Sequence, residues 1–179
     1  FQGRKIDFHT GSLSGLIAII GLDRSGYKAV VVLGNRDHAE MRHALMWNVL
    51  DNTEADERRD WNQDVFDLYE SRAQQADEKW AEIQQKRLEN TKPGLPPESY
   101  AGKYSNSAFG DILIEGTGSD MKLKTTLVDF EMSHWHLETF LVEFETWGLH
   151  EFATFTIGAD GSIQSVDVMG HTFERQPTQ

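Results

Sequence analysis

Two runs of aliphatic and β-branched residues near the amino terminus predict a β-hairpin. They cover residues 16–22 and 27–33, and the residues 23–26 between them have the composition of a turn. Because consecutive positions are apolar, both faces of these strands are expected to be covered, as in the middle of an α/β sheet. Residues 37–50, with Asp37 as candidate cap, predict one covering helix. Its expected apolar positions are Met41, Ala44, Leu45, Val49 and Leu50. A hairpin alone is marginal in water, so the other cover is expected to come from elsewhere.

The next segment, residues 54–91, is rich in Glu, Asp, Gln, Arg and Ala and predicts a long helix. Its acidic and basic residues are interspersed, which is typical of a solvated helical connector rather than of an acidic docking site. The Pro-rich stretch 92–97 ends the helix and marks a domain boundary. The apolar stripe of the helix comprises Trp61, Val65, Leu68, Ala76, Trp80 and Ile83, with Phe66, Tyr69 and Ala73 beside it.

From Tyr100 onward, short alternating runs separated by turn residues predict about eight antiparallel strands. Closure into a small barrel would remove the exposed edges, and such a barrel is either filled or a cup. The expected strands are 102–105, 111–115, 121–127, 132–136, 137–145, 151–157, 162–169 and 172–175. The aromatic residues of this part either form a packed core or line an apolar cavity, and they are Phe109, Phe130, Trp135, Phe140, Phe144, Trp147, Phe152, Phe155 and Phe173.

Composition narrows the classes of function. The 179 residues carry a formal net charge of -12 and contain no basic cluster longer than Arg58-Arg59, which argues against binding nucleic-acid phosphates. The longest apolar run, Leu16–Ile20, is far too short to span a membrane. The chain has no cysteine, a fact compatible with a reducing or an oxidising compartment. No cofactor is expected.

The sharpest short motif is His9-Thr10-Gly11, followed by the hairpin and by Asn35-Arg36-Asp37. This order resembles the end of the catalytic domain in the esterase-like branch of the serine β-lactamase and penicillin-binding-protein superfamily. Later motifs resemble the lipocalin-like domain, of uncharacterised role, that is fused behind such hydrolases. These motifs are Asp60-Trp61-Asn62, the Pro-rich boundary, Tyr100-Ala101-Gly102-Lys103-Tyr104, His134-Trp135-His136 and Thr139-Phe140.

The resemblance implies a Ser nucleophile with a Lys three residues later and a Tyr-x-Asn element, both upstream of this chain. His9 would offer a positive or hydrogen-bonding group, Thr10 a hydroxyl, and Gly11 room for the substrate. The backbone N–H of Ser12 would be one oxyanion donor. The chain by itself is therefore expected to be inert.

Two matches to the upstream motifs occur within the chain, and both are interpreted as accidental. Ser119 and Lys122 fit Ser-x-x-Lys, and Tyr104 and Asn106 fit Tyr-x-Asn. Ser119 follows a turn instead of starting a helix, where the Lys would lie one turn away from it. The chain order is also the reverse of the family's.

Together these observations predict an α+β protein: a truncated hairpin and helix of an α/β hydrolase-type sheet, a helical connector, and an eight-stranded lipocalin-like barrel. The expected divisions are a tag remnant at 1–3, the end of a catalytic domain at 4–53, the connector at 54–92 and the barrel at 93–179. The expected partners are the missing amino-terminal part of the catalytic domain and a second copy bound through the exposed hairpin. The resemblance implies a periplasmic or secreted location.

His134 and His136 are two residues apart, which places both on one face of a strand and Trp135 on the other. Such a pair could hold zinc with a third ligand from Glu131, Glu138, His150 or His171, but a role at the barrel rim without metal is favoured. With the aromatic residues, His134, Trp135 and His136 are candidates to bind a small apolar ligand or a peptide. The remaining alternative is an oligomerisation or interaction module.

Overall fold

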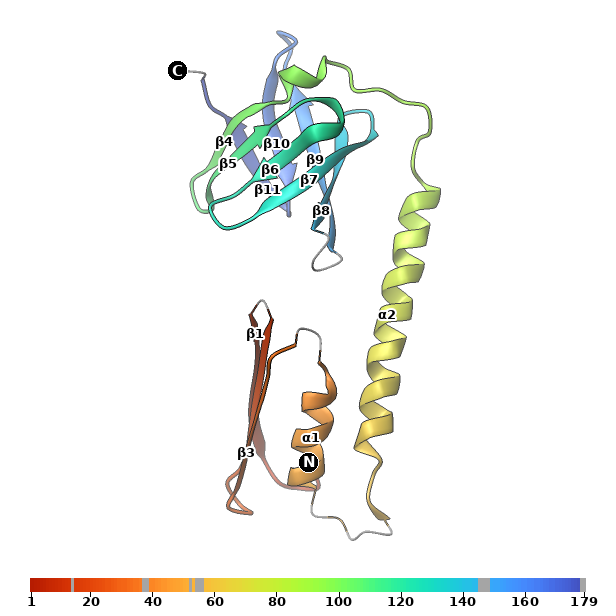
Figure 1. Cartoon of the computed structure of the whole chain (residues 1–179), viewed down its shortest axis with the longest axis vertical. Coiled ribbons are helices and arrows are strands. Elements are labelled where there is room, and N and C mark those ends of the chain that lie inside the picture. Colours follow the sequence, from red (N-terminus) through yellow and green to blue (C-terminus); the bar gives the residue numbers. More distant parts are fainter. Residues whose placement is uncertain (14, 37–38, 52, 54–56, 145–148, 178–179) are drawn as a thin grey trace. The chain divides into compact units, whose positions relative to one another are not determined.

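The computed structural model of the chain forms two compact units, Phe1–Ile83 and Gln84–Gln179 (Figure 1). The structure describes residues 1–13, 15–36, 39–51, 53, 57–144 and 149–177. Among these residues, no helix combines the length and the apolar character needed to cross a bilayer. Each unit has its own hydrophobic core, and the two are described separately.

The first unit contains a three-stranded antiparallel sheet in the order β1-β2-β3. The strands are β1 (Ile6–Leu13), β2 (Leu16–Asp23) and β3 (Lys28–Gly34). The predicted hairpin is thus β2–β3, and the strand bearing His9 pairs along its whole length with β2. In the described part of the chain, β1 and β3 are edge strands.

Helix α1 (Met41–Leu50) covers one face of this sheet. Met46 and Leu50 are fully buried against Ile19. A Cβ atom placed on Gly21 would lie 2.7 Å from Met46 Cγ, so the helix approaches the sheet at the one β2 position in this contact that has no side chain. This contact is the centre of the first unit's core.

The buried side of α1 differs from the predicted one. Ala44 and Leu50 are buried as expected, but Met41, Leu45 and Val49 are exposed, and Arg42 and Met46 are buried instead. The helix carries two apolar faces, and only one of them meets the sheet. Residue 37, the expected cap, lies outside the described residues, and Glu40 at the N-cap makes no side-chain cap bond.

The opposite face of the sheet is exposed. The register of the strands places Leu16, Ile20, Val31 and Leu33 on this side, and Val31 and Leu33 are 58% and 77% exposed. The prediction that both faces are covered is therefore met on the α1 side only.

Helix α2 (Trp61–Gln85) is shorter than the predicted 54–91. Asp60 starts it, because its carboxylate accepts hydrogen bonds from the N–H groups of Asn62 (3.1 Å) and Gln63 (3.0 Å). Trp61 is the only buried residue of α2, and its ring stacks on Trp47 at 5.1 Å. The rest of the stripe is partly or wholly exposed, as expected of a solvated helix.

Phe1 belongs to the same aromatic group as these two tryptophans. Its ring centroid lies 5.3 Å from that of Trp47 and 5.4 Å from that of Trp61. Residues 1–3, expected to be a tag remnant, therefore contribute packing to the first unit.

The second unit is a closed antiparallel barrel in the order β10-β11-β4-β5-β6-β7-β8-β9, which confirms the predicted architecture. The first four strands are β4 (Gly102–Asn106), β5 (Gly110–Glu115), β6 (Met121–Lys124) and β7 (Asp129–His136). The others are β8 (Thr139–Phe144), β9 (Leu149–Ile157), β10 (Ile163–Val168) and β11 (His171–Arg175). Two short 3-10 helices, η2 (Pro97–Ser99) and η3 (Gly118–Asp120), complete it.

The β6 strand is shorter than predicted and β7 is longer. A turn closed by the Thr125 N–H donating to the Val128 carbonyl (2.9 Å) ends β6 at Lys124, so residues 125–127 are not strand. The β7 strand then begins at Asp129 instead of 132.

Side chains fill the barrel interior. Tyr100, Tyr104, Phe140 and Phe155 form a buried ring cluster with centroid distances of 4.9–6.0 Å. Of the predicted aromatic set, Phe173 is also in the core, Phe130 packs against it, and Phe109 is exposed. The Phe144 side chain and Trp147 lie outside what the structure describes. Side chains of the described strands thus pack the barrel interior.

One end of the barrel is closed by the segment that enters it. The Tyr100 hydroxyl donates to Glu138 and accepts from the Leu95 N–H at 3.2 Å, and the Gly94 N–H donates to the same carboxylate at 2.7 Å. Burial, followed by the Glu138 carboxylate, raises the pKa of Tyr100 to about 12, so the phenol keeps the proton that it donates.

Replacing Gly21 tests the close approach of α1 to the sheet. Gly21→Val should lower the free energy of unfolding of the first unit by about 1–3 kcal/mol, because Met46 and Leu50 must move to admit the side chain. Chemical denaturation measures this. Gly11→Val is the matched control, since a Cβ there meets nothing within 4 Å. Equal effects of the two substitutions would contradict the packing described.

Asp51 links the two helices of the first unit in a pH-dependent way. Its burial, which favours the protonated acid, is outweighed by hydrogen bonds from Thr53 and from the Trp61 indole, and the pKa of Asp51 falls from 3.8 to about 2. The stability contributed by its ionised form is complete above about pH 4 and is lost as the pH falls toward 2. Asp51→Asn should therefore destabilise the first unit at pH 7 and reduce its loss of stability between pH 4 and 2. A smaller loss remains, because the pKa of the buried Asp23 is also lowered to about 2. An unchanged pH profile in urea denaturation would rule this out.

Candidate functional site

The His9-Thr10-Gly11 motif lies on the outer edge of the sheet, in β1. His9, Thr10, Gly11 and Ser12 are all exposed, and a Cβ on Gly11 would have open space around it. His9 pairs with Ile20 and shares the exposed apolar face of the sheet with it. The motif thus borders a surface that no described residue of the first unit covers.

Thr10 points to the other face, toward α1. Its hydroxyl donates to the Ala18 carbonyl (3.1 Å) and accepts from Arg42 Nε (3.0 Å), so it is engaged within the unit. A role toward a substrate, as the resemblance implies, requires this hydroxyl to leave the Ala18 carbonyl.

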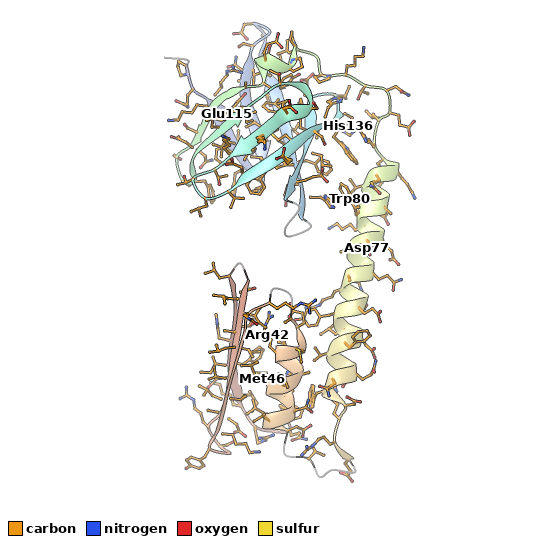
Figure 2. All side chains as sticks on the ribbon, viewed as in Figure 1. Arg42, Met46, Asp77, Trp80, Glu115 and His136 are labelled. Atoms are coloured by element: carbon orange, nitrogen blue, oxygen red, sulfur yellow. The ribbon has the colours of Figure 1, made fainter. Side chains whose placement is uncertain are left out.

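Arg42 is a buried residue that sequence reasoning missed. It is 6% exposed and forms an ion pair with Glu40 at 3.2 Å. Arg42 Nη1 is buried and makes no hydrogen bond to any described residue (Figure 2 labels Arg42 on α1). The only signal in the sequence is an arginine within an apolar stretch of a predicted helix.

In the barrel, the residues that match Ser-x-x-Lys and Tyr-x-Asn form hydrogen bonds to other residues and not to one another. Lys122 Nζ is bound to Glu131 at 2.7 Å, while Ser119 Oγ lies 3.3 Å from Asp120. The buried Tyr104 hydroxyl donates to the Tyr100 carbonyl at 2.8 Å, and the Asn106 amide donates to the Thr172 carbonyl. The structure thus does not join Ser119 and Lys122 as nucleophile and base.

The three residues His134, Trp135 and His136 lie at a β-bulge. In the pairing of β7 with β8, His134 is opposite Phe140 and His136 is opposite Thr139, so Trp135 is the extra residue. Trp135 is buried on the outer side of the barrel, with its ring 5.3 Å from that of Phe152. The bulge is why simple alternation does not describe this segment.

Both imidazoles bond to neighbouring main chain. His134 Nε2 donates to the Leu137 carbonyl (3.0 Å), and His136 Nδ1 accepts from the Leu88 N–H (3.3 Å). Among the described residues, no group of three His, Asp or Glu is placed to hold a metal ion. These contacts give the histidines a structural role next to the entering chain.

Arg87 covers the bulge. Its guanidinium carbon lies 4.5 Å from the Trp135 ring centroid, and it donates to the carbonyls of Trp135 (2.8 Å) and His134 (3.2 Å). A shallow pocket of about 460 Å³ beside it is lined mainly by polar groups of residues 87–91 and by His134. The segment before the predicted boundary at 93 therefore contributes to the barrel unit.

The second unit belongs to the class of small closed antiparallel barrels. Residues 86–179 match the family model described as Domain of unknown function (DUF3471), and the chain belongs to this family. No curated protein matches the chain. A solved structure described as SurE with D-Leu is similar at 13% identity with a TM-score of 0.42. The similarity covers 96% of this chain and 35% of that one, so the chain spans about a third of that structure's length.

Removing the Thr10 hydroxyl tests its link to α1. Thr10→Val should lower the free energy of unfolding by about 1–3 kcal/mol, because Arg42 Nε loses its acceptor beside the already unpartnered Nη1. Ser12→Ala, an exposed position on the same strand and face, should change it little. Thermal unfolding of both variants measures this difference. If the Thr10 hydroxyl were only solvated, Thr10→Val and Ser12→Ala would have equal effects.

Proposed function

We propose that residues 4–53 are the carboxy-terminal part of the catalytic domain of a β-lactamase-related serine hydrolase, and that the barrel is its accessory domain. The observation that carries this proposal is the sheet edge: His9 and Gly11 lie exposed on β1, next to an apolar face that no described residue of the first unit covers. A catalytic site needs a second wall, and the exposed face is where that wall would pack.

The family of the barrel supports the same proposal. DUF3471 domains are known as carboxy-terminal domains of β-lactamase-related proteins. An exported location, periplasmic or secreted, belongs to this proposal. So does self-association through the exposed face, as long as the face lacks its cover.

In the proposed enzyme, His9 presents a hydrogen-bonding or positive group to the substrate from the strand edge. Gly11 lets the substrate lie close to the strand, because no side chain occupies that space. The N–H of Ser12 acts as one oxyanion donor, and a serine outside this chain supplies the nucleophile. The chain alone holds one wall of the site and is inert.

The proposal is tested first on the chain itself, with nitrocefin and p-nitrophenyl butyrate as substrates. No turnover above buffer is expected, and Ser119→Ala should behave like the unmodified chain. Turnover that disappears in Ser119→Ala would overturn the proposal, since the nucleophile would then lie in the barrel.

The longer coding sequence provides the second part of the same test. A Ser-x-x-Lys helix and a Tyr-x-Asn loop are expected ahead of Arg4, and their absence would remove the proposal. In the protein that includes them, His9→Ala should lower kcat/KM for the ester about 100-fold. Ser12→Ala keeps the backbone donor and serves as the matched control.

A further inference from the structure

The end of the barrel opposite Tyr100 and Glu138 carries an apolar pocket that we call the barrel mouth. Its floor is formed by core side chains, including Ile112, Leu123 and Phe173, and its volume is about 270 Å³. Among the described residues, three hairpin turns bring Phe109, Leu127 and Met169 to its rim. Leu127 is 90% exposed and Phe109 is 60% exposed, so the rim presents large apolar groups to water.

The mouth exists because the tip of the β4–β5 hairpin extends beyond the pairing of β5 with β6. The pairing of β4 with β5 runs to Asn106 and Gly110, but that of β5 with β6 stops at Leu113 and Lys124. Asp111 and Ile112 therefore continue β5 without a partner on β6 among the described residues. On the other side the tip stays attached to β11. Asn106 Nδ2 donates to the Thr172 carbonyl at 2.8 Å, and the Phe109 ring stacks on that of His171 at a centroid distance of 3.9 Å.

This opening leaves a stretch of strand edge beside an apolar pocket. A peptide can bind to such an edge as an additional strand. The main-chain hydrogen bonds of the edge hold the peptide, and the pocket selects one of its side chains. The pocket lies below the roughly 300–1,000 Å³ of sites for drug-sized ligands and suits a single side chain.

The charges along this edge limit the ligand further. Lys103 is paired with Asp111 at 2.7 Å, and Lys124 is paired with Glu115 at 2.8 Å, with Asp129 at 3.9 Å. The cations lining this part of the barrel are thus already neutralised, within a chain whose net charge is -12. Since each of these charges already has an opposite partner, the complement to this edge is an uncharged segment.

From these observations we infer that the barrel mouth binds an extended, uncharged peptide segment. The segment runs along Asp111 and Ile112 and inserts one aromatic or large aliphatic side chain between Phe109 and Leu127. This site lies wholly in the second unit and is independent of the proposed hydrolase.

The probe for this site is the capped peptide acetyl-Thr-Thr-Phe-Thr-Thr-amide, titrated into the full chain and followed by ¹H–¹⁵N NMR. Saturable shifts are expected at residues 109–112, 125–127 and 169–173. Replacing the central Phe of the peptide by Ala should weaken binding about tenfold, because the pocket side chain is lost. N-methylation of alternate peptide amides should weaken it similarly, because strand pairing is blocked.

Two variants of the chain make the test specific. Phe109→Ser and Leu127→Ser should each weaken binding of the Phe peptide several-fold, and both positions are exposed enough to spare the fold. Tyr27→Ser, which removes an exposed aromatic group from a turn of the first unit, is the matched control and should leave binding unchanged.

Three outcomes would overturn the inference. One is the absence of saturable shifts at millimolar peptide, or binding that neither variant weakens. The second is a response at the mouth to phosphatidylcholine vesicles but not to the peptide, which would indicate a lipid surface. The third is a concentration-dependent shift at the mouth without peptide, which would indicate a second copy of the chain.

Discussion

The packing of α1 against one face of a three-stranded sheet is the constraint on which the first unit depends. Gly21 allows Met46 and Leu50 to reach the sheet, and this contact fixes which face is covered. Since successive residues of a strand alternate in direction, the same contact sends Thr10 toward the helix and His9 away from it. The chemistry proposed for His9 therefore follows from where the helix packs.

In the barrel, a missing contact creates the candidate binding site: β5 and β6 stop pairing before the tip of the β4–β5 hairpin, and this opens the barrel mouth. Alternating side chains fill the barrel interior, and the entering segment closes one end through Tyr100 and Glu138. At the other end, β6 stops at Lys124, opposite Leu113, so the first residues of β5 have no partner on β6 among the described residues. A closed barrel can thus keep a core packed with side chains and still offer a strand edge, provided that two neighbouring strands differ in length.

The barrel could be predicted from the sequence because the alternation in β5, β8 and β9 is a property of each strand alone. The bulge at Trp135 could not, since a bulge depends on how two strands pair. The hairpin β2–β3 was likewise readable, whereas the buried face of α1 was not. Met41, Leu45 and Val49 have helical spacing too, and spacing does not reveal which of two apolar faces meets the sheet.

Of the candidate site, the sequence singled out the motif His9-Thr10-Gly11 through its resemblance to a known family, but not the surroundings of Thr10. Arg42 lies 32 residues further along the chain, and its bond to Thr10 arises from tertiary packing. The barrel mouth was also missed, because Phe109, Leu127 and Met169 belong to three separate turns. Residues that come together only through the order of the strands in the barrel form no recognisable pattern in the sequence.

The guanidinium of Arg87 has a practical consequence for anyone who excises the barrel. Proline-rich stretches invite a cut, but a fragment beginning at Pro93 would lose the cation above the Trp135 ring and the two donors to the carbonyls of residues 134 and 135. It would also lose the Leu88 amide that His136 accepts from. The barrel domain that could be fused to another protein with all of these contacts intact therefore begins before Arg87.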